Sequence, residues 1–170
     1  NHGATGIDKN IDPTRPYAMS NFNMLGYNLR ISDIQAAVGI AQMAKLNRLL
    51  SERRRLALNY SKLLSNFKDI ILPLDDPGHT YQSYVIRMSN GKKLLRNKIM
   101  DHLISLNIQT RPGTHAVHRL GYFKKKYSLK DNDFVNAIKA EDTSITLPIF
   151  PGMTDKQQET VVSNISKVLK

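Results

Sequence analysis

Residues 26–39, with the sequence GYNLRISDIQAAVG, contain the transition that decides the fold, because a loop ends there and a long helix begins. Ser32 and Gln35 have the spacing of a capping box, in which two side chains bind each other's backbone N–H groups at a helix start. Apolar residues then recur at helical spacing, and no proline follows before Pro73. The pattern predicts one long helix over residues 32–66.

The two halves of this expected helix carry different side chains. Small residues in the first half would let another element approach closely, whereas the second half is basic. The small residues are Ala36, Ala37, Gly39, Ala41 and Ala44, and the arginines are Arg48, Arg53, Arg54 and Arg55. Tight packing within one domain and an ordinary solvated face would explain the two patterns equally well.

The segment that precedes the helix, residues 1–31, does not have the pattern of an independent fold. It contains Gly3 and Gly6, the pairs Asp12-Pro13 and Arg15-Pro16, and several asparagines, all of which favour turns and loops. A loop of this length is uncommon inside a compact domain unless it is functional. We therefore expect the segment to lie against structure that is outside this chain.

Residues 67–170 have the pattern of a small α+β unit. Alternating side chains predict strands, and apolar residues at helical spacing predict helices. The expected elements are, in chain order, a strand at 84–88, a helix over 95–106, strands at 108–110 and 145–149, and a C-terminal helix that begins at a second capping box, Thr154 with Gln157. This order favours a small sheet with helices on one face.

The charge of the chain is unevenly distributed. Residues 1–85 carry a net charge of +3 and residues 86–170 a net charge of +8, out of +11 in total. Such a field attracts phosphate groups, so that nucleic acid, a nucleotide-linked substrate or an acidic partner domain would each fit. Apolar residues make up 41% of the chain, enough for a core. No apolar run approaches the roughly 20 residues of a membrane helix, so we expect no membrane partner.

Cysteine is absent, which excludes disulfides, thiolate zinc sites and cysteine nucleophiles and is compatible with a reducing cytoplasm. His115 and His118 are spaced so that two imidazoles could lie close together. A zinc site needs at least three protein ligands, however, and we expect no metal. The same two residues belong to the loop from Arg111 to His118, where arginine, threonine and histidine side chains make a plausible binding loop. An ordinary solvent-facing loop is the alternative.

Two stretches could bind phosphate or nucleic acid. Residues Gly26–Arg30 immediately precede the long helix, whose N-terminus attracts anions. Lys124–Lys126 lie between Tyr122-Phe123 and Tyr127, a combination that nucleic-acid interfaces use. No glycine-rich phosphate loop and no recognised nucleic-acid-binding motif accompanies them, so a basic nucleic-acid module is a remote alternative and we expect no nucleic-acid partner.

Residues 26–39 resemble the signature of the DegT/DnrJ/EryC1/StrS sugar aminotransferases, which are fold-type I enzymes that use pyridoxal phosphate. The resemblance covers nearly the whole chain in the family's order. Its further motifs are Asn1-His2-Gly3, Ala41-Gln42, Lys45-Leu46, Arg53-Arg54 with Tyr60, Ile108–Pro112, His115, His118, Gly121–Phe123 and Leu147–Asp155.

The resemblance implies that the complete protein is an α/β enzyme of fold type I and that this chain is its α+β C-terminal part. Residues 1–31 would be the end of the large cofactor domain with a loop, residues 32–66 the long linking helix, and residues 67–170 the small C-terminal domain. The enzyme would be a cytoplasmic homodimer with shared active sites. It would move an amino group, usually from glutamate, to a keto group of a nucleotide-linked sugar of polysaccharide biosynthesis, using pyridoxal 5'-phosphate.

The resemblance also implies roles for five residues. Asn28 would reach the cofactor phosphate in the neighbouring subunit's site, with Arg30 beside it. Arg111, His115 and His118 would border the site of the sugar nucleotide. No catalytic residue is expected, because the family's Schiff-base lysine lies upstream of Asn1. We therefore expect this fragment to be inactive alone.

Because the lysine position lies upstream, the sequence leaves two alternative functions possible for a member of this family. Some members of the family replace that lysine with histidine and dehydrate the sugar instead. Others could keep the fold as non-catalytic binding or regulatory proteins.

Overall fold

A three-stranded antiparallel sheet lies at the centre of the chain in the computed structural model, which describes residues 4–7, 12, 14–26 and 31–170. The strands are β3 (Ile70–Ile71), β4 (Tyr84–Met88) and β5 (Ser144–Leu147), in the order β3-β4-β5. The predicted strand at 84–88 is confirmed. The strand expected at 145–149 begins one residue earlier and ends at Leu147, before Pro148, which has no N–H to donate to a ladder.

Alternation along β4 separates the core from the opposite face of the sheet. Tyr84, Ile86 and Met88 are fully buried, whereas Val85 and Arg87 between them are half-buried. Ile86 pairs with Ile145 and Tyr84 with Leu147, so the buried side chains of neighbouring strands lie on one face. This face packs on apolar side chains from three helices, α2 (Leu46–Leu64), α3 (Lys93–Ser105) and α6 (Asp155–Leu169).

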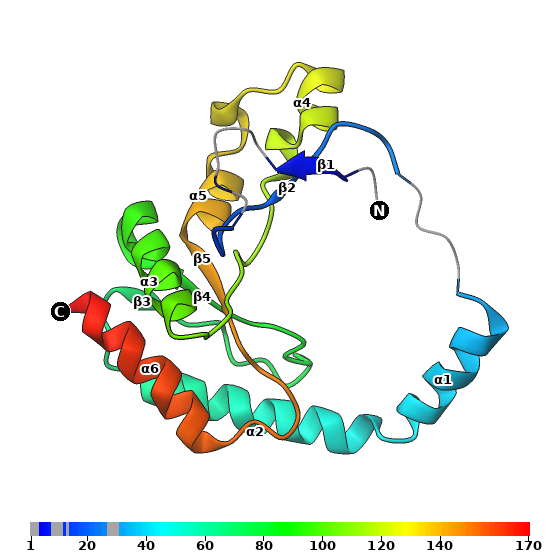
Figure 1. Cartoon of the computed structure of the whole chain (residues 1–170), viewed down its shortest axis with the longest axis vertical. Helices are drawn as coiled ribbons and strands as arrows, with labels where there is room; N and C mark the ends of the chain where they lie inside the picture. Colours follow the sequence, from blue (N-terminus) through cyan, green and yellow to red (C-terminus); the bar gives the residue numbers. More distant parts are fainter. Residues whose placement is uncertain (1–3, 8–11, 13, 27–30) are drawn as a thin grey trace.

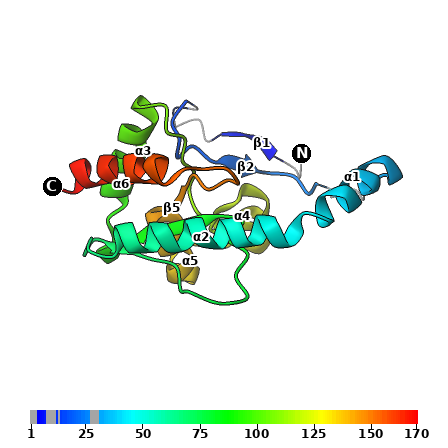
Figure 2. The same cartoon turned by 90° about the horizontal axis from the view of Figure 1, so that it is seen from below.

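The C-terminal helix α6 lies beside both α2 and α3 (Figures 1 and 2). Its predicted capping box is confirmed: the Thr154 hydroxyl accepts from the Gln157 N–H, and the Gln157 side chain accepts from the Thr154 N–H. Val161, Val162 and Ile165 form its buried face, as the helical spacing predicted. The expected α+β class is thereby confirmed for this part of the chain.

The long helix expected over residues 32–66 is divided into two. Ser32 caps α1 (Asp33–Met43) with the predicted capping box, and α2 follows after a break at Ala44 and Lys45. No glycine or proline stands at the break. The two helices differ in packing instead, because α2 buries one face in the core whereas α1 has no buried residue and projects from the rest of the chain (Figure 2).

The N-terminal segment contains a short hairpin where the sequence indicated only a loop. Strand β1 (Ala4–Ile7) pairs antiparallel with β2 (Ser20–Phe22). Twelve residues separate the two strands, so no tight turn marked the pairing in the sequence.

The segment between α3 and β5 is more helical than expected. It contains α4 (Gly121–Tyr127), α5 (Val135–Thr143) and two 3-10 turns, η2 (Val117–Arg119) and η3 (Asp131–Phe134). The strand expected at 108–110 does not form. The chain makes a single bridge one residue later, from Arg111 to Thr146. Among the described helices, none has the length and apolar character needed to cross a membrane.

Candidate functional site

The loop that the sequence singled out, Arg111–His118, is attached at its start to the last strand of the sheet. The Thr146 N–H donates to the Arg111 carbonyl over 2.7 Å, and the Arg111 N–H donates back over 3.4 Å. Two residues later, the Gly113 N–H donates to the Ser144 hydroxyl over 3.0 Å. The backbone of the loop is therefore held along the edge of β5.

Gly113 permits this close approach. A Cβ atom at position 113 would lie 2.5 Å from Val85 Cγ1 and 2.7 Å from Ser144 Cβ. Both are shorter than contacts between carbon atoms allow. Only glycine lets the loop pass this close to the outer face of the sheet.

The end of the loop is held by a carboxylate from α5. Glu141 accepts the Ala116 N–H through Oε2 over 2.6 Å and binds the Arg119 guanidinium through Oε1 over 2.9 Å. Arg119 also bridges Asp142 and Asp131. Because charged hydrogen bonds are the strong ones, this network fixes the loop just after His115.

Arg111 and His115 line the same hollow, which lies between the loop and residues 14–20 and has a volume of about 600 Å³. Arg111 is exposed, so its guanidinium is free to meet a ligand from solvent. Thr110 is buried in the wall, and its hydroxyl has no hydrogen-bond partner among the described residues. A hollow with an arginine, an imidazole and an unused hydroxyl suits a polar, negatively charged ligand.

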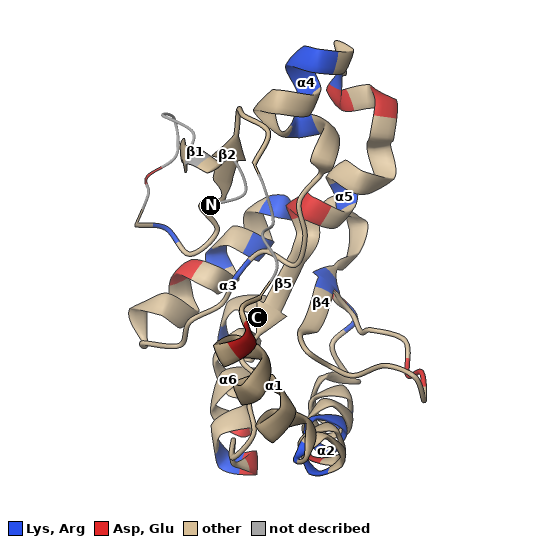
Figure 3. Ribbon diagram, turned by 90° about the vertical axis from the view of Figure 1, so that its right-hand side faces the viewer, with Lys and Arg blue, Asp and Glu red and all other residues tan. Residues whose placement is uncertain are grey.

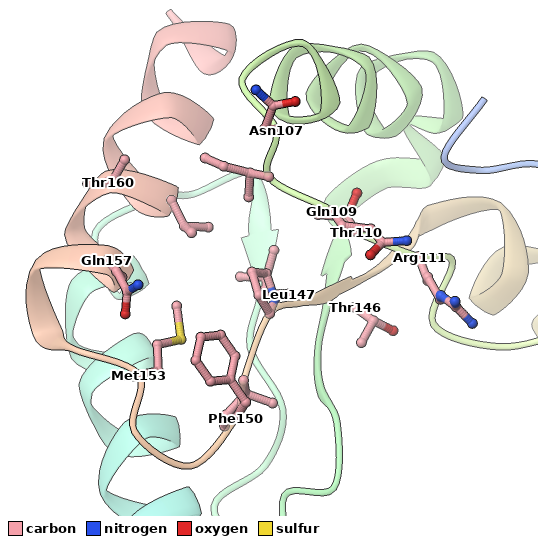
Figure 4. A pocket seen from close by; sticks show the side chains of 14 residues that line it. Asn107, Gln109, Thr110, Arg111, Thr146, Leu147, Phe150, Met153, Gln157 and Thr160 are labelled. Atoms are coloured by element: carbon pink, nitrogen blue, oxygen red, sulfur yellow. The ribbon is translucent and has the colours of Figure 1, made fainter. Parts of the chain in front are cut away.

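A second hollow, of about 580 Å³, lies on the other side of residues 109–111 (Figure 4). Gln157 and Thr160 of α6 are at one end of it and Arg111 is at the other, with Phe150 and Met153 below. Arg111 and Thr110 thus belong to both hollows. The strip from Gln109 to Arg111 forms the wall that they share.

His115 is half-buried, and its ring meets the edge of Phe22 at a centroid distance of 5.8 Å. Burial lowers the pKa of His115 from its ordinary value, and the nearby carboxylate of Glu141 opposes this shift only in part. The imidazole is therefore biased toward its neutral form, in which one ring nitrogen donates and the other accepts a hydrogen bond.

His118 does not line the hollow that Arg111 and His115 share. It is only 5% exposed, its ring packs on Phe134 at 5.1 Å, and Nε2 has no hydrogen-bond partner among the described residues. It lines an apolar hollow among α4, η3 and α5, and His115 lines this hollow as well. The structure thus places Arg111 and His115 at one hollow and His115 and His118 at another.

The two residues expected at the cofactor, Asn28 and Arg30, lie outside the described residues. The helix start that follows them is described, and Ser32 uses its hydroxyl there to cap α1. Within the described part of the chain, no three His, Asp or Glu side chains cluster as metal ligands would.

Sequence reasoning missed Glu141, Arg119 and Thr110 as parts of this region. Arg119 directly follows the predicted loop, but nothing local indicated its partners. Glu141 stands in a helix that the pattern did not predict. Only the folded chain brings Glu141 and Arg119, which are 22 positions apart, to one side of the loop.

The family model of the DegT/DnrJ/EryC1/StrS aminotransferases matches residues 3–166 of the chain. Three curated relatives have similar levels of sequence identity to this chain. The spore coat polysaccharide biosynthesis protein SpsC of Bacillus subtilis is 28% identical over 85% of this chain and 38% of its own length. The GDP-perosamine synthase of Caulobacter vibrioides is 26% identical over 94% and 42%. The dTDP-4-dehydro-2,6-dideoxy-D-glucose 3-dehydratase of Saccharopolyspora spinosa is 27% identical over 86% and 32%.

Solved structures share the fold. The aminotransferase PseC of Helicobacter pylori, involved in the biosynthesis of pseudoaminic acid, superposes with a TM-score of 0.74 at 18% identity over 99% of this chain and 43% of its own. An aminotransferase from Brucella abortus gives 0.68 at 21% identity over 86% and 38%. The chain thus spans about two fifths of the length of most of these proteins.

Proposed function

Because the chain belongs to the DegT/DnrJ/EryC1/StrS aminotransferase family, we propose that it is the C-terminal part of an enzyme that aminates a nucleotide-linked sugar. The amino group would come from an amino acid, glutamate in this proposal, and would be delivered to a keto group of the sugar. The match over residues 3–166 carries the proposal. The chain would supply the linking helices and the small domain of a cytoplasmic enzyme.

The hollow between the loop and residues 14–20 would take part of the sugar nucleotide. Arg111 would bind a phosphate oxygen, because a guanidinium presents paired donors to an oxyanion. His115, biased toward its neutral form by burial, would hydrogen-bond a sugar or base group and leave the charge to Arg111. His118 would keep the neighbouring part of the loop packed on Phe134.

The cofactor of the family is pyridoxal 5'-phosphate. When bound, it supplies the electron sink that lets an amino group leave one substrate and join another. In this chain, Asn28 and Arg30 would hold its phosphate. The helix N-terminus that begins at Ser32 would favour the negative charge there.

The exposed apolar side chains of α1 support a homodimer with shared active sites. Ile34 and Ile40 are 81% and 73% exposed, and none of the helix's residues is buried within this chain. Exposed apolar surface of this kind normally belongs to an interface. In the proposed enzyme, the second subunit would cover part of it.

The test uses the full-length protein, purified with pyridoxal phosphate. Borohydride reduction followed by peptide mapping should find a pyridoxyl-lysine upstream of Asn1. Adding glutamate to the unreduced protein should convert the visible spectrum to that of the pyridoxamine form, as an amino-group donor requires. A protein that binds no cofactor would contradict the proposal.

A dehydratase is the second candidate, favoured by the similarity to the Saccharopolyspora spinosa 3-dehydratase. The same mapping distinguishes the two, because a lysine-less dehydratase would bind the cofactor without forming a reducible lysine adduct. A non-catalytic member would show neither the adduct nor the spectral change with any donor.

A further inference from the structure

Arg96, in the first half of α3, is a buried arginine that has no carboxylate partner among the described residues. It is 4% exposed. Its Nη1 donates to Met100 Sδ over 3.7 Å, its guanidinium stands 5.9 Å from the centre of the Tyr17 ring, and Nε has no hydrogen-bond partner in the described part of the chain. A guanidinium has five N–H donors and stays charged, so burial without acceptors is costly.

Arg96 lines a cavity of about 380 Å³. The cavity lies between α3, α5 and the segment Tyr17–Asn21, which leads into β2. Asn97, the neighbour of Arg96 on α3, also lines it, and the Oδ1 atom of Asn97 is buried without a partner among the described residues. Two adjacent side chains that each have an unsatisfied polar atom thus line one cavity.

The carboxylates in the cavity wall do not supply the missing acceptors. Asp142 binds Lys93 over 3.0 Å and Arg119 over 3.1 Å, while Glu141 binds Arg119 and the Ala116 N–H. In Figure 3, basic positions of α3 lie beside acidic positions of α5, and the ion pair of Lys93 with Asp142 joins the two helices. Burial lowers the pKa of Arg96, and the field of Asp142 and Glu141 opposes that shift without a hydrogen bond.

The residues that line the cavity carry one net positive charge, with Lys93, Arg96 and Arg119 against Glu141 and Asp142. Arg119 has a further partner, Asp131, outside this lining. The other local charges are therefore paired around Arg96, and the hydrogen-bonding groups that line the cavity include the guanidinium of Arg96 and the side-chain amide of Asn97.

We infer that this cavity binds a small oxyanion, a phosphate or carboxylate group held by the guanidinium of Arg96 and the side-chain amide of Asn97. A guanidinium binds such groups through two parallel N–H donors. The Asn97 amide, turned so that its NH₂ group faces the cavity, adds two more donors. The inference does not depend on the proposed function, although the cavity shares His115, Met19 and Ser20 with the Arg111 hollow.

The test measures the thermal midpoint of the full-length protein, with its cofactor bound, as inorganic phosphate replaces chloride at constant ionic strength. We expect a saturable rise, because a ligand that binds only the folded state stabilises it. Sodium acetate, titrated in the same way, distinguishes a phosphate site from a carboxylate site. A rise with either anion supports the inference, and no rise with both overturns it, since water would then satisfy Arg96.

Three variants locate the effect. Arg96→Lys keeps the charge but loses the paired donors, and we expect the apparent affinity for the anion to fall about tenfold, with Asn97→Ala weakening it less. Lys98→Met is the matched control, because Lys98 is exposed on the same helix and does not line the cavity. An anion response that survives in Arg96→Lys unchanged, or that Lys98→Met abolishes, would overturn the assignment.

Discussion

At the scale of single residues, Glu141 connects helix α5 to the loop that carries Arg111 and His115. One carboxylate oxygen accepts a backbone N–H of the loop, and the other binds Arg119. Its own side chain is mostly buried. Glu141 is therefore a positioning residue in the proposed enzyme, because it acts on the ligand only through the loop.

Replacing Glu141 should loosen the loop without removing any ligand contact. We expect Glu141→Ala to lower the free energy of unfolding by about 1–3 kcal/mol, because it leaves the Ala116 N–H and Arg119 without their acceptor. Glu141→Gln keeps an acceptor and should cost less. In the full-length enzyme, KM for the sugar nucleotide should rise more than kcat falls. The exposed Glu159→Ala on α6 is the control, and an equal effect there would contradict the assigned role.

The depressed pKa of His115 predicts a pH dependence of stability. Burial lowers this pKa below the ordinary value of 6.5, so the unfolded chain takes up a proton more readily than the folded chain. The stabilisation is fully present above pH 6.5 and is lost as the pH falls toward the folded-state pKa. Chemical unfolding of the chain between pH 7.5 and 5 should show a steeper loss in the wild type than in His115→Gln. If the free energy of unfolding falls equally with pH in the wild type and in His115→Gln, His115 does not contribute to the pH dependence of stability.

At the scale of elements, the passage of the loop over the sheet depends on Gly113. We expect Gly113→Ala to lower the free energy of unfolding by about 1–3 kcal/mol, because the added methyl overlaps Val85 and Ser144. Gly39→Ala on α1 is the matched control, since a Cβ there meets no atom within 4 Å and alanine favours the helix. Thermal unfolding of the isolated chain would compare the two. Equal destabilisation would show that the close approach is not the cause.

Helix α1 tests the proposed interface. The double substitution Ile34→Asp with Ile40→Asp should leave the thermal midpoint of the isolated chain unchanged, because neither side chain is buried there. In the full-length protein it should shift the dimer toward the monomer, as sedimentation would measure. Leu94→Asp on α3, at a residue that is 77% exposed, is the control. It should change neither the thermal midpoint of the isolated chain nor the oligomeric state of the full-length protein. A full-length variant that stays dimeric would place the interface elsewhere.

At the scale of the whole molecule, the chain contains a core of its own, whereas the proposed enzyme would draw part of its active site from outside this chain. The core joins α2, α3 and α6 to the sheet, and Tyr60 ties α2 to the loop after β5 by donating to the Pro148 carbonyl over 2.9 Å. Burial raises the pKa of the adjacent Tyr84 to about 12, in keeping with a dry interior. We therefore expect this chain to fold by itself without having catalytic activity.

We expect the isolated chain to unfold in one cooperative transition and to show no transaminase activity with pyridoxal phosphate and glutamate. Several of its lysines are engaged in ion pairs with carboxylates, among them Lys92 with Asp69 and Lys93 with Asp142. Circular dichroism on heating and a coupled glutamate assay would measure the two properties. Transaminase activity in the isolated chain would contradict the proposal that the catalytic lysine lies upstream of Asn1.

The sequence by itself determined the elements whose signals are local. The capping boxes at Ser32 and Thr154, the alternation along β4 and the spacing of α6 depend on neighbours within a few residues, and all of them are present in the structure. The linked motifs from residue 26 to residue 155 also predicted the family, because each motif is a short run that needs no knowledge of its surroundings.

Only the tertiary structure decided how the candidate site is built. It divided the expected long helix at Ala44 and paired β1 with β2. It also kept His118 out of the hollow that Arg111 and His115 share, although all three stand within eight positions of one another. The residues that surround Arg96 in its cavity and the partners of Glu141, likewise, come from elements far apart in the chain. Burial and charge pairing depend on which distant segments meet, and a local pattern contains no information about that meeting.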